Sequence, residues 1–204
     1  KDLSGETLMD VVEEISKVIK KYPNVVWCLD MVSSAGGTKI EIDKLGVDIC
    51  ITSTQKALGL PPGMAICSFS KKAIERAKNV KNRGYYLDLL SIYNYIQKKD
   101  YQYPSTPCIS IMYAMDYQLD KILEEGLENR YKRHIEMADY VRSWGRKNFQ
   151  LFADEKYLSN TLTTIKNTKD IDISILNNKL GERGFQISNG YGKLKQKTFR
   201  IAHM

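Results

Sequence analysis

The sequence predicts an α/β domain followed by a smaller α+β domain. Residues 6–21 carry apolar side chains at the spacing of an amphipathic helix. Apolar runs of strand length follow at residues 25–29, 47–52 and 64–69. Continuous runs of this kind are typical of parallel strands that are buried on both faces. A helix that is followed by such strands indicates the α/β class.

The next stretch is predicted to be mainly helical. Ser70 is a plausible N-cap for a helix that begins directly after the third apolar run. The tyrosine-rich residues 85–103 are expected to be partly helical, and two prolines then interrupt the chain. Helical spacing returns over residues 109–148, in two segments that part near Gly126.

The C-terminal part of the chain is predicted to form the small α+β domain. Its expected elements are three short strands and one helix, at residues 158–165, 185–188, 198–202 and 171–180. We therefore predict a large domain over residues 1–130 and a small domain over residues 131–204.

Composition narrows the possible partners. The chain has 204 residues and a net charge of +7, but its basic clusters are short and broken by acids and apolar residues. We therefore expect no nucleic-acid partner. No run of 18 apolar residues and no secretory signal is present, so we expect no membrane span and a cytoplasmic protein.

The cysteines and histidines do not suggest a metal centre. The four cysteines form no CxxC pair, and the chain has two histidines. Cys28, Cys50 and Cys67 lie in apolar runs, and Cys108 follows a proline. None of them is predicted to be an exposed loop thiol.

Two polar residues follow apolar strands and are candidates for chemistry. Asp30 ends the first strand, where it either caps the next turn or pairs with a cationic group. Lys56 follows the second strand and comes directly after residues 52–55, whose side chains carry three hydroxyl groups and one amide. A lone loop lysine is usually a surface residue, but a partly desolvated lysine can attack a carbonyl group. In open α/β sheets, ligands bind at the carboxyl ends of the strands.

Arg200 is the third candidate. It lies in Thr198-Phe199-Arg200-Ile201-Ala202, the last predicted strand. An arginine fork binds carboxylates through two parallel hydrogen bonds. The alternative is an outward-facing residue on an edge strand.

Together these residues carry a resemblance to a known family. Asp30 in Leu29-Asp30-Met31-Val32-Ser33-Ser34-Ala35-Gly36-Gly37 is followed by Lys56 in Ser53-Thr54-Gln55-Lys56-Ala57-Leu58-Gly59-Leu60-Pro61-Pro62-Gly63. This pattern resembles class V aminotransferases, in particular the alanine–glyoxylate and serine–glyoxylate (serine–pyruvate) enzymes. The resemblance implies a fold-type I transferase that uses pyridoxal 5'-phosphate. It also implies a homodimer with shared active sites.

The resemblance assigns a role to each matching residue. Lys56 is implied to form the Schiff base with the cofactor and to move a proton. Asp30 is implied to hold the ring nitrogen protonated, and Val32 to pack under the ring. The other implied contacts are Ser53 and Gln55 at the phosphate or ring oxygen, Tyr103 and Thr106 at the neighbouring subunit's phosphate, and Arg200 at the substrate carboxylate.

The expected reaction is transamination between alanine or serine and glyoxylate or pyruvate. Proteins of this family carry further large-domain residues upstream, including a glycine turn for the phosphate, and a helix beyond the position of Met204. We therefore expect the chain to be a C-terminal fragment. Three alternatives stay open: a 2-aminoethylphosphonate–pyruvate transaminase, a cysteine-desulfurase-like enzyme, and a non-catalytic dimerisation module.

Overall fold

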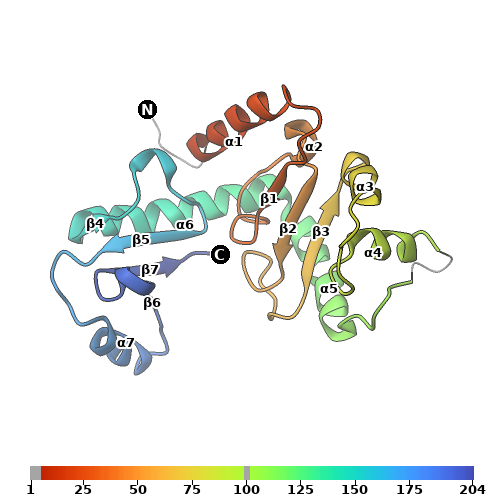
Figure 1. Ribbon diagram of the computed structural model, residues 1–204. Helices are drawn as coiled ribbons and strands as arrows, with labels where there is room; N and C mark the ends of the chain where they lie inside the picture. Colours follow the sequence, from red (N-terminus) through yellow and green to blue (C-terminus); the bar gives the residue numbers. More distant parts are fainter. Residues whose placement is uncertain (1–5, 99–101) are drawn as a thin grey trace. The chain divides into compact units, whose positions relative to one another are not determined.

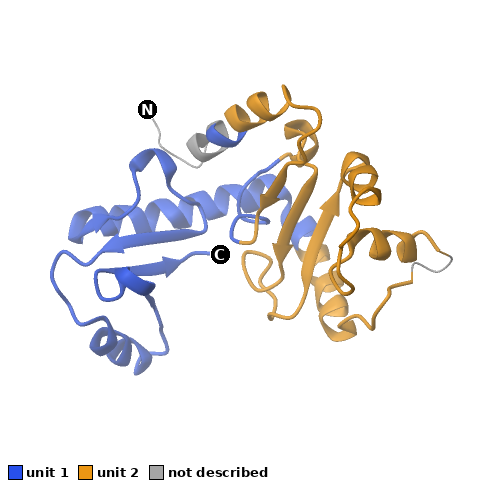
Figure 2. Cartoon of the chain, in the orientation of Figure 1, with its two compact units in different colours: residues 1–12, 33–40, 122–204 blue, residues 13–32, 41–121 orange. Residues whose placement is uncertain are grey.

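The computed structural model describes residues 6–98 and 102–204, which form two compact units. Unit 1 comprises residues 1–12, 33–40 and 122–204, and unit 2 comprises residues 13–32 and 41–121 (Figure 2). Both units are discontinuous in sequence, because residues 33–40, which directly follow Val32, belong to unit 1. The predicted division into residues 1–130 and 131–204 stays a prediction.

Unit 2 contains a three-stranded sheet with the order β1-β2-β3 (Figure 1). These strands are β1 (Cys28–Asp30), β2 (Ile49–Ser53) and β3 (Ala65–Phe69). The first two strands are parallel, with Asp30 opposite Ile51. The expectation of parallel strands is wrong for β3, which runs antiparallel to β2. Residues 54–64 form a tight connection between β2 and β3, whereas a parallel pair needs a crossover of a dozen or more residues.

The first strand is shorter than its apolar run predicts, because a carboxylate takes over part of its hydrogen bonding. The Trp27 N–H donates to Asp48 Oδ2 at 2.9 Å, and Trp27 O accepts from the amides of Asp48 and Ile49. Asp48 is 5% exposed and also pairs with Lys72 at 2.7 Å. The residues before Cys28 therefore lie outside the strand ladder.

Most of the predicted helices are confirmed. The bounds are α1 (Glu6–Ile19), α2 (Ile42–Leu45), α3 (Lys71–Lys78), α4 (Leu89–Ile96), α5 (Ile109–Glu125) and α6 (Leu127–Asn148). Ser70 caps α3, because its Oγ accepts from the Ala73 amide at 3.1 Å. Gly126 separates α5 from α6 at φ = 81°, a conformation that glycine adopts without steric cost.

Unit 1 contains an antiparallel sheet with the order β4-β5-β7-β6. Its elements are β4 (Gln150–Leu151), β5 (Leu162–Lys166), β6 (Ser188–Asn189), β7 (Thr198–Ala202), α7 (Ile173–Gly181) and the short 3-10 turns η1 (Glu155–Tyr157) and η2 (Gly192–Leu194). The core of this unit is formed by Leu151, Leu158, Ile165, Ile173 and Phe199. In the described part of the chain, no helix combines the length and apolar character needed to span a bilayer.

Two buried histidines of unit 1 are held by carbonyl groups. His203 Nδ1 donates to Asn160 O, and its Nε2 accepts from the Thr163 hydroxyl, both at 2.9 Å. His134 Nδ1 donates to Arg130 O at 2.9 Å. Carbonyl oxygens only accept, so both rings carry their proton on Nδ1. Desolvation by burial lowers the pKa of both imidazoles below the usual value.

This burial predicts a loss of stability in mild acid. The unfolded chain binds protons at the two histidines near pH 6.5, whereas the folded chain binds them only at lower pH. Stability is therefore full above about pH 6.5 and falls as the pH decreases, by at most about 1.4 kcal/mol per pH unit for each histidine. Urea unfolding between pH 5 and pH 8 measures this slope. His203→Gln should give a shallower slope, and an unchanged slope would refute the assignment to His203.

Candidate functional site

The candidate site lies at the carboxyl ends of the two parallel strands of unit 2. Asp30 is the last residue of β1, and Lys56 follows the end of β2 by three residues. Because Asp30 is in register with Ile51, the two strands end at the same edge of the sheet. The structure thus places the carboxylate and the lysine that the sequence singled out at the carboxyl ends of two adjacent parallel strands, β1 and β2 (Figure 1).

Three consecutive hydroxyl residues at this edge differ in what they bind. Thr52 Oγ1 donates to Met31 O at 3.3 Å, and Thr54 Oγ1 donates to Pro61 O at 2.7 Å. Ser53 Oγ is also buried, yet it has no hydrogen-bond partner within the described residues. Side chains alternate across a strand, so Ser53 lies on the same face of the sheet as Ile51 and its partner Asp30. An unpaired buried hydroxyl is unfavourable, so Ser53 is suited to bind an external group.

A compact turn holds Lys56. The Gly59 amide donates to Lys56 O at 2.8 Å, and the Leu60 amide donates to Thr54 O at 3.0 Å. The Lys56 side chain is half-buried, and its ammonium group makes no ion pair or hydrogen bond with the described part of the protein. Gln55 is exposed beside it. Lys56 is therefore available to react with a bound molecule.

Asp30 has one engaged and one available carboxylate oxygen. Its Oδ1 accepts from the Val32 amide at 2.8 Å. No donor among residues 6–98 and 102–204 contacts Oδ2. The turn-capping interpretation and the charge-partner interpretation are therefore compatible, since the turn fixes the carboxylate and leaves one oxygen for a cation. Val32 is half-buried directly after it.

The turn after Lys56 depends on Gly63. Its φ is 138°, and an added Cβ would lie 2.8 Å from Ile111 Cδ1. Gly63→Ala is therefore expected to lower the free energy of unfolding by more than about 1 kcal/mol. Gly181→Ala is the matched control, because Gly181 has open space around it and no positive φ. Thermal unfolding of both variants measures the difference, and equal melting temperatures would contradict the prediction.

Tyr103 and Thr106 are not joined to the Lys56 turn by any hydrogen bond in the described part of unit 2. Both are exposed and line a surface hollow that precedes α5, together with Met112. Their predicted contact with the phosphate of a neighbouring subunit stays a prediction.

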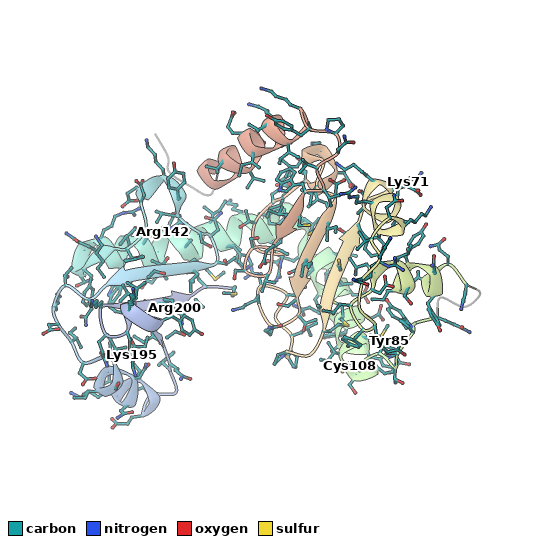
Figure 3. The ribbon with its side chains drawn as sticks, viewed as in Figure 1. Lys71, Tyr85, Cys108, Arg142, Lys195 and Arg200 are labelled. Carbon is teal, nitrogen blue, oxygen red and sulfur yellow. The ribbon has the colours of Figure 1, made fainter. Side chains whose placement is uncertain are left out.

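Arg200 lies in unit 1, on β7 (Figure 3). The edge-strand alternative is wrong, because β7 lies between β5 and β6 in the sheet. Its Nε donates to Asn189 O at 3.2 Å, and its guanidinium carbon lies 4.3 Å from the centre of the Tyr191 ring. Neither terminal nitrogen of Arg200 donates to a described protein group. Sequence reasoning missed Tyr191 as a partner, because the contact joins a loop residue to a strand and leaves no local pattern in the sequence.

The exposure of the thiols differs from the sequence-based expectation. Cys50 is buried and Cys67 is half-buried, and burial raises the pKa of both thiols. Cys108 is an exposed loop thiol, contrary to the prediction that no cysteine is one, and Cys28 is exposed within strand β1. Cys28 begins β1, an edge strand of the sheet, and Cys108 directly precedes α5.

Known aminotransferases are similar to this chain in sequence and in fold. An uncharacterized aminotransferase from Methanocaldococcus jannaschii is 40% identical over 199 residues, which are 95% of this chain and 50% of that protein. The serine–glyoxylate aminotransferase of Arabidopsis thaliana is 34% identical over 98% of this chain and 51% of its own. A crystal structure of alanine–glyoxylate aminotransferase from Nostoc sp. matches with a TM-score of 0.85 and 26% identity, over 95% of this chain and 52% of its own.

The chain spans about half the length of the curated relatives that it matches. The class V aminotransferase family matches residues 3–194 of the chain. With relatives above 30% identity over nearly all of its residues, and with the same fold in solved aminotransferases, the chain belongs to the class V aminotransferase family.

Proposed function

We propose that this protein catalyses pyridoxal-phosphate-dependent transamination between a small amino acid, alanine or serine, and a 2-oxo acid, glyoxylate or pyruvate. The observation that carries the proposal is the pair of Asp30 and Lys56 at adjacent parallel strand ends. The named activities of the relatives from Arabidopsis thaliana and Nostoc sp. support this substrate class. Because the chain spans half of those relatives, the activity is proposed for the protein at its natural length.

The residues at the strand ends fit pyridoxal 5'-phosphate. The cofactor has a phosphate, a ring nitrogen and an aldehyde, and the site offers groups that complement them. Ser53 Oγ is buried without a partner, Asp30 Oδ2 is open, and the Lys56 ammonium is unpaired within the described residues. Ser53 and Gln55 would bind the phosphate or the ring oxygen, and Val32 would pack against the ring. When bound, the cofactor supplies an electron sink for the substrate α-carbon.

Each proposed role follows from the chemistry of the side chain. The amine of Lys56 would hold the cofactor covalently and would also carry a proton to or from the substrate α-carbon. Asp30 Oδ2 would keep a proton on the ring nitrogen, because a carboxylate stabilises a neighbouring cation. Arg200 binds the α-carboxylate through its two terminal nitrogens. Tyr103 and Thr106 serve the site of a second subunit, which makes the proposed enzyme a homodimer.

Absorbance spectroscopy and product analysis test the proposal. The protein at its natural length, loaded with pyridoxal phosphate, is mixed with alanine or serine and with glyoxylate or pyruvate. We expect the cofactor band to shift with the amino donor and glycine or alanine to form from the oxo acid. 2-Aminoethylphosphonate and cysteine are the comparison donors. A preference for the phosphonate, sulfide release from cysteine, or no reaction with any donor would overturn the proposal.

A further inference from the structure

The surroundings of Arg200 indicate how a carboxylate-binding arginine is kept in place. The backbone of Arg200 is fixed within the sheet, because it is opposite Thr164 on one side and Ser188 on the other. The preceding residue, Phe199, is 1% exposed and belongs to the core of unit 1. Side chains alternate along a strand, so burial of Phe199 directs Arg200 to the opposite face of the sheet.

Two neighbours then restrict the guanidinium group itself. Asn189 O accepts the hydrogen bond of Nε, and the guanidinium carbon lies over the Tyr191 ring, 4.3 Å from the ring centre. A cation over the face of an aromatic ring is attracted by the ring quadrupole. The two terminal nitrogens of the guanidinium group have no described protein partner. These nitrogens are the ones that bind a carboxylate through two parallel hydrogen bonds.

The loop that carries Tyr191 is held by its own hydrogen bonds. Asn189 Oδ1 accepts from the amides of Gly190 and Gln196, both at 2.8 Å. The Gly190 amide also lies 2.9 Å from Thr198 O. An added Cβ at Gly190 would lie 2.2 Å from Leu194 O, so only glycine permits this close approach. Tyr191 is 77% exposed, so its ring is not held by burial in a core.

We infer that Tyr191 is a positioning residue for recognition of the substrate carboxylate. It stacks on Arg200, limits the orientations of the guanidinium, and so presents the two terminal nitrogens together. Asn189 supports the same geometry through its backbone carbonyl. This inference rests on the proposed function, in which Arg200 binds the α-carboxylate.

The test compares Tyr191→Leu with Tyr191→Phe in the cofactor-loaded protein at its natural length. Leucine removes the aromatic face, whereas phenylalanine keeps it. An exposed cation–π contact corresponds to about a two- to fivefold change in affinity. We therefore expect Tyr191→Leu to raise KM for alanine by about two- to fivefold with little change in kcat, and Tyr191→Phe to retain the wild-type KM. Alaninol lacks the carboxylate, so its dissociation constant should be equal in all three proteins.

A second measurement is independent of activity. The NMR signal of the Arg200 Nε–H, assigned with Arg200→Lys, senses the ring current of Tyr191. It should move in Tyr191→Leu and stay in Tyr191→Phe. An unchanged KM for alanine in Tyr191→Leu, or an equal loss for alaninol, overturns the inference. Absence of amino transfer by the wild-type protein instead overturns the proposed function, and an unmoved NMR signal would show that the stacking is absent.

Discussion

Replacing Lys56 with alanine is expected to abolish transamination. The variant loses the amine that is proposed to hold the cofactor and to move the proton at the substrate α-carbon. Loss of a positioned proton-transfer group alone lowers rates by about 10²- to 10⁴-fold. The fold should survive, because the half-buried Lys56 side chain has no hydrogen-bond or ion-pair partner within the described residues. Steady-state rates with alanine and glyoxylate, together with circular dichroism, measure both effects.

Lys71→Ala is the matched control for this variant. Lys71 begins α3, is exposed and also has no described ion pair (Figure 3). It should keep the wild-type rate, because it lies at the opposite end of β3 from the Lys56 turn. Lys56→Arg keeps the positive charge without an amine that reacts readily with aldehydes, and it should be as inactive as Lys56→Ala. If Lys56→Ala retained more than a tenth of the wild-type rate, another residue would have to carry the cofactor.

Asp30→Asn is expected to lower the rate strongly while preserving the turn. The amide oxygen of asparagine can still accept from the Val32 amide, as Asp30 Oδ1 does at 2.8 Å. The other side-chain position changes from a carboxylate oxygen to an NH₂ donor, which cannot stabilise a protonated ring nitrogen. Hydrogen bonds to charged groups contribute about 1.5–3 kcal/mol, so kcat should fall by about 10- to 150-fold.

The control for this variant is Asp120→Asn on α5, because Asp120 is exposed and has no described partner. Rates are compared after equal cofactor loading, so that weaker binding is separated from slower chemistry. The absorbance spectrum of the loaded protein should also change in Asp30→Asn, because the ring nitrogen loses its proton more easily. Wild-type kcat and an unchanged spectrum in Asp30→Asn would remove Asp30 from the site.

The elements that were predicted well are those specified by nearby residues. The helical spacing of α1 and α6 and the Ser70 cap are local signals, and Gly126, at φ = 81°, separates two helices. The shortening of β1 could not be predicted, because it depends on the Asp48 carboxylate, which replaces strand pairing at Trp27. The strand β4 was also missed, since two residues carry no periodicity and their pairing with β5 is non-local.

In the candidate site, too, the features that depend on local sequence could be predicted and those that depend on distant contacts could not. Asp30 and Lys56 could be paired from the sequence, because apolar runs show where parallel strands end. The free hydroxyl of Ser53 could not be identified, because it depends on Thr52 and Thr54 finding backbone carbonyls elsewhere. The contact between Arg200 and Tyr191 depends on the conformation of the loop that carries Tyr191. That conformation requires the close approach of Gly190 to Leu194 O, which is not visible in the sequence.

Covalent trapping is the most direct test of the role of Lys56. The protein at its natural length is loaded with pyridoxal phosphate, reduced with borohydride and digested, and its peptides are weighed by mass spectrometry. We predict that the mass of the reduced cofactor appears on the peptide that contains Lys56, and that Lys56→Arg does not carry it. Cofactor mass on a different lysine, or on no peptide of a protein that absorbs as cofactor-loaded, would contradict the central claim.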